Sequence, residues 1–350
     1  MTLERSRPPL RTADLPKVGG SLGPNPEDFV VDEIPAYLPS GQGEHVYVRV
    51  KKRLMTTRDA ALALSRSAHV SERDVGYAGM KDKHGVTTQW FSLPRTARDP
   101  EHLALPPELE VLEVSRHGNK LRTGHLRGNR FALGIVDVPP GGIERARALL
   151  ERLVEQGLFN TFGAQRFGRD GENLATALAW LRGETSLPRS RERFLSKLYS
   201  SAIQAEAFNR YAIARAELGL GRLVPGEVVR LGGSGSFFVV ERPENEVPRL
   251  LAGDIALTGP LPGPKLRPTA TGDGLELEKQ VLEELGLGAE ELRTLSAHAP
   301  GTRRDLVVRP EHTDVRGEDD RLVIRFELPS GSYATEVLRE LLRSGETETV

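Results

Sequence analysis

One segment of the 350-residue sequence gathers several side chains that could do chemistry: Gly76-Tyr-Ala-Gly-Met-Lys-Asp-Lys-His-Gly-Val-Thr-Thr-Gln-Trp90. Within it, Asp82 lies between Lys81 and Lys83. Adjacent cations favour the ionised form of a carboxylate, so Asp82 is expected to be an anion near neutral pH. A carboxylate on a loop between two strands is a candidate nucleophile or general base. The alternative is a solvated turn, because Lys-Asp-Lys sequences are common on protein surfaces.

A second segment, from His117 to Phe131, carries the kinds of group that hold RNA. It combines basic residues with glycines, an amide side chain and an aromatic ring. Guanidinium and ammonium groups bind phosphates, and an aromatic ring stacks on an exposed base. Phe131 is therefore either a base-stacking residue or a core residue of a strand, and the segment alone does not choose between them.

The charge of the chain is balanced overall but unevenly distributed. The 48 basic and 49 acidic residues give a net charge of −1. The range 111–135 has a net charge of +4, whereas the range 270–293 has a net charge of −5. Such a chain can bind a polyanion on one face, although charged runs more often mark solvated surface. We assign no function to the acidic range.

Several kinds of site are excluded or disfavoured by the sequence. The absence of cysteine removes disulfides, thiolate catalysis and cysteine-based metal centres. Gly232-Gly-Ser-Gly235 does not complete a dinucleotide-binding fingerprint, and no pair of histidines has the spacing of a zinc protease. We therefore expect no cofactor and no metal site.

The sequence also carries no signal for a membrane. No apolar run approaches the roughly 18 to 20 residues that a membrane span needs. Charged residues occupy the start of the chain, where a signal peptide has an apolar stretch. We expect a cytoplasmic protein with no membrane contact and no obligate protein partner.

The elements that must position these groups follow from hydrophobic periodicity and from turn residues. Strands are predicted at 29–34, 46–50, 75–78, 86–93, 109–116, 130–138, 228–231, 237–241, 306–309 and 322–328. Helices are predicted at 59–69, 143–156, 172–182, 191–218 and 333–343, and a loop or linker at Gly259–Pro264.

The order of these elements indicates an α+β fold with a mainly antiparallel sheet, interrupted by an inserted, mostly helical domain. The expected boundaries are 1–157 for the first part of the sheet domain, 158–302 for the insertion and 303–350 for the closing part.

A set of motifs in fixed order closely resembles the TruD family of tRNA pseudouridine synthases. The motifs are Gly79-x-Lys81-Asp82-x-x-x-x-Thr87-x-Gln89, Gly128-Asn129-x-Phe131, Phe162-Gly-x-Gln-Arg-Phe-Gly168, Glu27-Asp-Phe-Val-Val-Asp-Glu33 and Pro329-Ser-Gly-Ser-Tyr-Ala-Thr335. Several separate motifs in order are far more specific than any one of them. One departure is Thr161, where such sequences usually have an aromatic residue.

The resemblance implies a pseudouridine synthase domain with an inserted α/β domain specific to the family. It implies that Asp82 is the catalytic aspartate and that Phe131 packs against the target base, with Asn129 and Lys81 as neighbours. Further candidates for contact with substrate are Phe29, Tyr333 and Arg166. The implied substrate is uridine 13 in the D-arm of certain tRNAs.

The implied reaction suits these residues. Isomerisation of uridine breaks the glycosidic bond, turns the base within the site and rejoins it through carbon, so one well-placed carboxylate suffices. Asp82 could attack C1′, add to C6 of the base or remove a sugar proton, and the sequence leaves all three routes open. The rival hypothesis is a non-catalytic module that binds or folds tRNA. A small-molecule hydrolase would need a base and nucleophile pair that the sequence does not offer.

Overall fold

The computed structural model describes residues 7–97, 103–168, 171–318 and 321–343, and the chain divides into two compact units. The first, which we call the sheet unit, comprises residues 14–156, 309–334 and 338–350. The second, the inserted unit, comprises residues 1–13, 157–308 and 335–337. The inserted unit extends to Val308 because β13 (Val307–Val308) pairs with β8 (Leu158–Phe159) at its other end.

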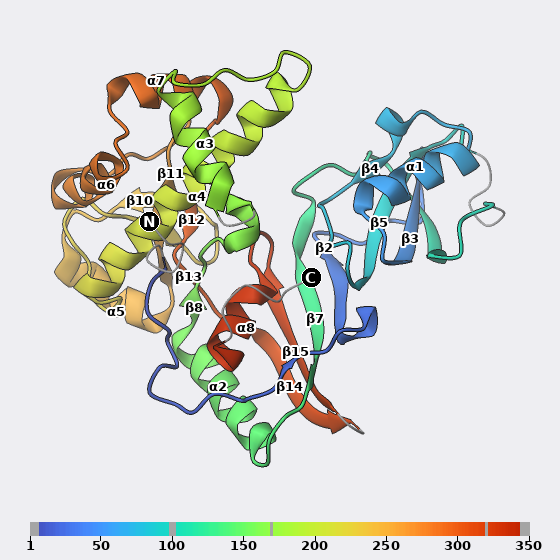
Figure 1. Ribbon diagram of the computed structural model, residues 1–350, viewed down its shortest axis with the longest axis horizontal. Helices are drawn as coiled ribbons and strands as arrows, with labels where there is room; N and C mark the ends of the chain where they lie inside the picture. The colour runs from blue at the N-terminus through green and yellow to red at the C-terminus, as the bar shows by residue number, and fades with distance from the viewer. Residues whose placement is uncertain (1–6, 98–102, 169–170, 319–320, 344–350) are drawn as a thin grey trace. The chain divides into compact units, whose positions relative to one another are not determined.

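The sheet unit is built on a nine-stranded sheet with the order β14-β15-β7-β2-β5-β3-β6 (Figure 1). Two short strands lie off this path, β1 against β7 and β4 against β5. All pairs are antiparallel except β2 with β5. The strands are β1 (Ser21–Leu22), β2 (Phe29–Pro35), β3 (His45–Arg53), β4 (Gly76–Tyr77), β5 (Val86–Pro94), β6 (Leu109–His117), β7 (Leu126–Val136), β14 (Glu311–Glu318) and β15 (Arg321–Pro329). The predicted α+β fold with a mainly antiparallel sheet is confirmed.

Helix α1 (Thr57–Ser67) covers one part of this sheet. It begins where the Thr56 hydroxyl accepts a hydrogen bond from the backbone N–H of Asp59 at 3.1 Å, which is a standard N-terminal cap. Its Ala60 and Leu64 pack in one core cluster with Val48 of β3. Burial of this apolar face holds the helix on the strands.

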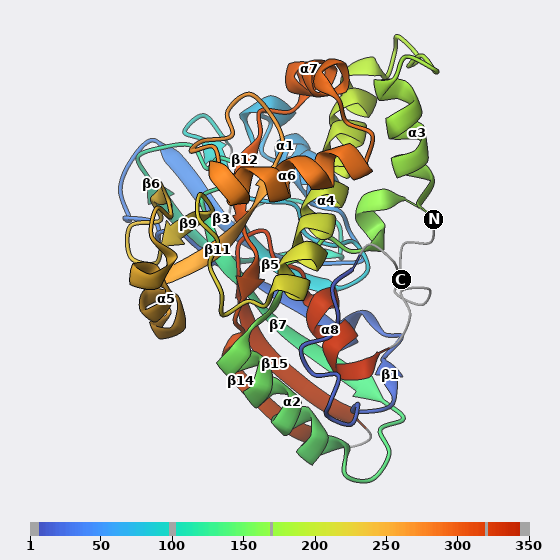
Figure 2. The same ribbon diagram turned by 90° about the vertical axis from the view of Figure 1, so that its left-hand side faces the viewer.

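Two more helices belong wholly or partly to the sheet unit. Helix α2 (Gly142–Gln156) runs alongside β14 and β15 (Figure 2). In the closing helix α8 (Ala334–Leu342), the Leu341 carbonyl accepts a hydrogen bond from the N–H of Val18 at 2.9 Å. The segment around Val18 is therefore joined to the end of α8 within this unit.

The inserted unit combines a four-stranded antiparallel sheet, in the order β10-β9-β11-β12, with several helices. Its strands are β9 (Val228–Leu231), β10 (Phe237–Val239), β11 (Ile255–Leu261) and β12 (Thr302–Asp305). Its helices are α3 (Glu172–Leu181), α4 (Glu192–Leu218), α5 (Pro243–Ala252), α6 (Gly272–Glu284) and α7 (Ala289–His298). Across the described residues, no helix is long and apolar enough to cross a membrane.

The loop predicted at Gly259–Pro264 is partly wrong, because β11 continues to Leu261. Gly259 is needed inside the strand for a packing reason. A Cβ atom at that position would lie 2.8 Å from the Phe208 ring of α4. The glycine therefore lets the long helix approach the strand. The prediction of a loop was wrong here because it rested on the glycines and prolines of the segment.

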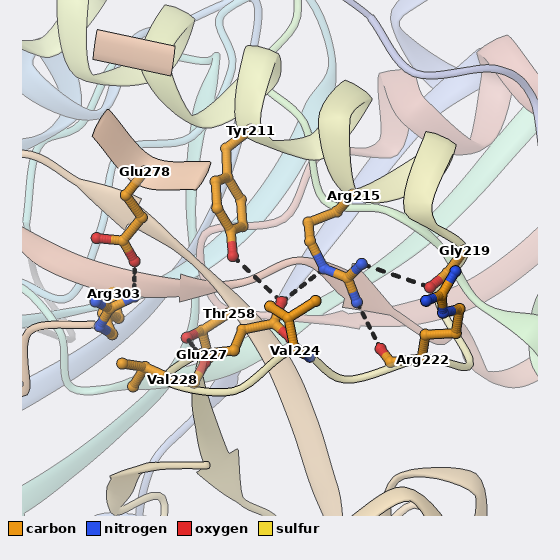
Figure 3. Close-up of polar contacts among 10 residues, drawn as sticks. All are labelled: Tyr211, Arg215, Gly219, Arg222, Val224, Glu227, Val228, Thr258, Glu278 and Arg303. Atoms are coloured by element: carbon orange, nitrogen blue, oxygen red, sulfur yellow. Dashed lines mark hydrogen bonds and ion pairs between the residues drawn. The ribbon is translucent and has the colours of Figure 1, made fainter. Parts of the chain in front are cut away.

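The core of the inserted unit contains charged groups that neutralise one another (Figure 3). Arg215 of α4 forms an ion pair with Glu227 at 2.6 Å, and the side chains of both are at most 1% exposed. Tyr211 donates a hydrogen bond to the same carboxylate at 3.3 Å. Burial raises the pKa of Glu227, and the Arg215 guanidinium opposes that rise. Nearby, Arg303 of β12 pairs with Glu278 of α6 at 2.9 Å.

Candidate active site

The loop that carries Asp82 joins β4 to β5 and is fixed through its backbone. The N–H of Lys81 donates to the Thr57 hydroxyl at 2.8 Å. That hydroxyl in turn donates to Oε1 of Gln89 at 2.9 Å, and Nε2 of Gln89 donates to the Gly79 carbonyl at 3.3 Å. The first turn of α1 and the middle of β5 thus hold the loop from two sides.

The side chain of Lys81 anchors the loop to strand β2 of the sheet. Its ammonium lies 2.9 Å from Oε2 of Glu33, and the two side chains are 3% and 1% exposed. The other carboxylate oxygen of Glu33 accepts a hydrogen bond from the N–H of Trp90 at 3.1 Å. The charge of Lys81 is therefore already neutralised by Glu33, which favours a structural part for this residue. Contact between Lys81 and substrate stays a prediction.

Lys52 of β3 is a second buried cation under the same loop. It is fully buried, and its ammonium donates hydrogen bonds to the backbone carbonyls of Met55 and Asp82, the latter at 2.8 Å. Burial lowers the pKa of Lys52 to about 8, and the nearby charge of Asp82 acts in the opposite direction. Lys52 thus holds the backbone of Asp82 and brings a positive charge close to it.

Asp82 itself differs from every other group in this network. The residue is exposed, and its carboxylate makes no hydrogen bond or ion pair with the parts of the chain that the structure describes. The backbone of its loop is anchored by three buried side chains, from β3, α1 and β5, of which Lys52 holds Asp82 itself, while its acidic group is left available. A fixed backbone with an available carboxylate is the arrangement that a nucleophile or general base requires.

Strand register brings other predicted residues to the same face of the sheet. Glu33 of β2 is paired with Asn129 of β7, and Val31 with Phe131. Val31 is also aligned with Thr87 of β5, which is paired with Lys52 of β3. Since paired residues and alternate residues share a face, the sheet presents these side chains together. The face includes Phe29, Glu33, Lys52, Thr87, Gln89, Asn129 and Phe131.

Asn129 is half-buried on this face, and its side-chain amide is only partly hydrogen-bonded. Its Oδ1 atom is buried and has no hydrogen-bond partner among the described residues. A buried acceptor without a donor is costly, so such an atom often marks a place where a ligand or water binds.

Phe131 lies deeper than a stacking platform would need. It is 5% exposed, and its ring stacks on Phe326 of β15 with centroids 5.3 Å apart. Phe29, which is half-buried, meets the Phe131 ring edge-on at 6.5 Å. The burial favours the core interpretation for most of the Phe131 ring. Contact with a base stays a prediction for both rings.

The last two predicted residues lie on different units. Tyr333 is the half-buried residue just before α8 and belongs to the sheet unit. Arg166 belongs to the inserted unit, where its guanidinium donates to the Ser201 hydroxyl at 2.8 Å and lies 5.4 Å from the Phe162 ring centroid. Thr161, the departure from the family pattern, is fully buried and donates to Glu336 at 2.6 Å. The hydroxyl at this position therefore satisfies a buried carboxylate.

The basic segment expected to hold RNA is largely paired within the protein. Arg130 binds Glu327 through two guanidinium nitrogens, at 2.6 and 2.9 Å, and Arg127 reaches the same carboxylate at 3.4 Å. Lys120 donates to the Arg73 carbonyl at 2.6 Å. Arg116 and Arg122 are exposed. The local excess of positive charge is therefore smaller in the folded protein than in the sequence.

Comparison with known proteins decides the family. The family model described as tRNA pseudouridine synthase D (TruD) matches residues 9–186 and 181–341. The chain belongs to the TruD family. It is 48% identical to a tRNA pseudouridine synthase D of Anaeromyxobacter sp. (strain Fw109-5), with 96% of each chain covered. It is 40% identical to a tRNA pseudouridine synthase D of Thermus thermophilus, over 96% of this chain and 92% of the other.

A solved structure supports the same family. The crystal structure of a protein described as TruD from Methanosarcina mazei superimposes with a TM-score of 0.71 at 25% identity, covering 98% of each chain. The predicted family is thereby confirmed, and with it the class of enzyme, an RNA pseudouridine synthase with tRNA as its substrate.

Three residues of the candidate site had no role predicted from the sequence: Glu33, Lys52 and Thr57. The signal for the first two was present in the strand alternation. Lys52 continues the inward series Val46, Val48 and Val50, and Glu33 continues Phe29 and Val31. A charged residue at an inward position is rare without a purpose. Thr57 shows no comparable pattern.

Proposed function

We propose that this enzyme converts uridine 13 in the D-arm of tRNA to pseudouridine, with Asp82 as the catalytic carboxylate. The observation that carries this assignment is the contrast within one loop. Asp82 is exposed and has no partner in the described chain, while the surrounding Lys81, Lys52 and Thr57 are buried and hydrogen-bonded. A turn that merely crosses the surface does not need three buried side chains to hold it.

The carboxylate can serve each of the three chemical routes. It can attack C1′ and displace the uracil anion, it can add to C6 of the base, or it can remove the C2′ proton as the glycosidic bond breaks. In every route the base turns while it is held, C5 then bonds to C1′, and the C5 proton is lost. Asp82 is released from C1′ in the first route and from C6 in the second, and in the third the proton returns to C2′. The Lys52 ammonium interacts electrostatically with Asp82, so a positive charge lies beside the carboxylate that all three routes use.

The face of the sheet beside the loop supplies groups that suit a uracil ring. The buried, unpartnered Oδ1 of Asn129 could accept the N3–H of uracil. Phe29, the more accessible of the two rings, could stack on the base, with the edge of Phe131 beneath it. Taking the base out of its stack costs a few kcal/mol, which such contacts offset.

We propose the sheet unit as the catalytic domain and the inserted unit as the family-specific domain. We further propose that the enzyme works in the cytoplasm without a cofactor, a metal or an obligate protein partner. Dialysis against EDTA should leave turnover unchanged once magnesium is restored for tRNA folding. A zinc or manganese requirement that magnesium cannot replace would refute the metal-free mechanism.

The position of the target is tested with transcripts that lack all modifications. The protein is incubated with a tRNA transcript that has uridine at position 13, and pseudouridine is mapped at single-nucleotide resolution. A matched transcript with cytidine at position 13 is the control. We expect one pseudouridine, at position 13, and none in the control. Modification of another uridine in both transcripts would refute the position and retain the class of reaction.

The rival hypothesis of a non-catalytic tRNA-binding module is set aside by the family, and the position of Asp82 argues against it as well. A carboxylate at a phosphate-binding surface repels the backbone and lowers affinity, so a module that only binds gains nothing from anchoring one there.

A further inference from the structure

The connection between α3 and α4 presents a run of cations with an exposed aromatic ring. The sequence from Arg189 to Lys197 is Arg-Ser-Arg-Glu-Arg-Phe-Leu-Ser-Lys, with a net charge of +3, and we call it the basic arm. All four cations are exposed, and Phe194 is 61% exposed. The arm leads from the C-terminal end of α3 into the N-terminal end of α4, at the top of Figure 1.

The cations of the basic arm are unpaired, unlike many other exposed cations of the chain. Within the described residues, Arg189, Arg191, Arg193 and Lys197 form no ion pair. Elsewhere in the same unit, Arg249 pairs with Glu246 at 2.6 Å and Lys279 with Glu276 at 2.8 Å. Three arginines within five residues, with Glu192 as the one carboxylate among them, give a local positive potential that attracts a polyanion.

The basic arm also contains the second element of nucleic-acid recognition, a flat ring that is free to stack. The Arg191 guanidinium lies 5.9 Å from the centroid of the Phe194 ring, so the charge and the ring form one small surface. Exposed aromatic rings stack on unpaired bases, and neighbouring arginines bind the adjoining phosphates. A single exposed phenylalanine is ordinary, but one set among unpaired arginines is not.

The basic arm is held rigidly enough to bind without a large ordering cost. From Glu192 onward it is the first turn and a half of α4, whose later turns pack against β11. Ser196 is buried on the inner side of this helix, and Trp180 of α3 contacts Tyr199 just beyond the arm. Arg193 and Lys197 therefore lie on the first turns of a packed helix, whereas Arg191 is its N-cap residue and Arg189 lies in the turn before it.

We propose that the basic arm is a tRNA-binding surface of the inserted unit, with its arginines on phosphates and Phe194 stacked on an unpaired base. This inference rests on the proposed function, because it takes tRNA as the polyanion. It adds a contact that lies on a different unit from Asp82 and that the motif residues do not include.

The test measures binding of a tRNA transcript over a series of salt concentrations. Replacing Arg189, Arg191 and Arg193 together by Gln should flatten the slope of log K against log[salt] by about 2 to 3. Replacing the same three by Lys should keep the slope. The control replaces Arg249, Lys279 and Arg293 by Gln, which removes the same charge from the same unit, and its slope should stay at the wild-type value.

Phe194 is tested separately with two RNAs. Phe194→Ala should weaken binding of the tRNA by roughly 5-fold to 100-fold and leave binding of a fully paired RNA duplex unchanged. Equal slopes for the arm variant and wild type, or an equal loss of slope in the control, would overturn the proposal. Binding is measured without turnover, so the two proposals can fail separately. If the arm variant flattens the salt slope but no pseudouridine forms at position 13, only the assignment of the target uridine is refuted.

Discussion

Two carboxylates, Asp82 in the sheet unit and Glu227 in the inserted unit, show how differently this protein treats an acidic group. Glu227 is buried and bound by Arg215 and Tyr211. Asp82 is exposed and unpartnered among the described residues, although its backbone is held by buried groups. A fully satisfied buried charge serves the fold, whereas an unsatisfied charge on an anchored backbone is available for chemistry.

The network around Glu227 should produce the largest loss of stability when it is broken. Arg215→Met leaves the carboxylate buried without its cation and also removes hydrogen bonds to the Gly219 and Arg222 carbonyls. We expect a loss of about 4 to 5 kcal/mol, measured by thermal or urea unfolding. Replacing both partners by apolar residues, as Arg215→Met with Glu227→Leu, should recover at least half of it. A single variant that loses less than about 1 kcal/mol would contradict this role.

Breaking the ion pair between Lys81 and Glu33, beneath the loop of Asp82, should cause the next largest loss of stability. Lys81→Met leaves Glu33 buried with only the Trp90 N–H as partner, at an expected cost of about 3 to 4 kcal/mol. Turnover should fall with it, because the loop loses its anchor. The exposed neighbour Lys83, changed to Met, is the control and should shift stability by no more than about 0.5 kcal/mol. If the two variants behave alike, the anchoring account fails.

Phe131→Ala separates a core ring from a stacking ring. Its burial against Phe326 predicts a loss of about 3 kcal/mol, the low end for a buried phenylalanine, because the half-buried Phe29 can shift toward the space. Calorimetry measures the loss. Phe131→Leu should restore more than half of the stability, and if it also restores turnover, the ring is not needed for stacking. A stability equal to that of wild type in the Ala variant would contradict the core interpretation.

The burial of Lys52 should have a smaller effect on stability, and one that depends on pH. Its pKa is about 8 in the folded protein and near 10.5 when exposed, so the folded state releases its proton first. The cost of burying the charge is present below pH 8 and is relieved as pH rises from 8 to 10.5. Relative to a Lys52→Met variant, wild type should therefore gain about 2 to 3 kcal/mol between pH 6 and pH 10. If the difference in unfolding free energy between wild type and Lys52→Met is the same at every pH, the lowered pKa of Lys52 is refuted.

Much of the fold could be predicted because its signals are local. The alternation Val46, Val48 and Val50 predicted β3, and the apolar spacing within 191–218 predicted α4. Strand β14 escaped because Glu311-His-Thr-Asp-Val-Arg-Gly-Glu318 is an edge strand with one buried residue, so it lacks an apolar face. Most of the acidic range 270–293 forms α6 and the start of α7, and its Glu278 pairs with Arg303.

The candidate site was only partly predictable, for a physical reason. The reactive loop and its motif residues stand together in the sequence, so Asp82 and Lys81 could be selected directly. The partners of that loop come from β2, β3 and α1. Only the register of the sheet brings Glu33 and Lys52 to the loop, and the packing of α1 on the sheet brings Thr57. Pairing within the fold also neutralised part of the basic segment, which a count of charges does not reveal.

The smallest effect on stability should accompany the largest effect on turnover, at Asp82. Asp82→Asn keeps the shape of an exposed side chain and leaves the backbone anchors in place, so unfolding should stay within about 0.5 kcal/mol of wild type. The decisive measurement is single-turnover pseudouridine formation with saturating tRNA. The account predicts that the rate falls by at least about 1,000-fold, roughly 4 kcal/mol, while tRNA binding persists. A folded, tRNA-binding Asp82→Asn protein that isomerises uridine at more than a few per cent of the wild-type rate would contradict it.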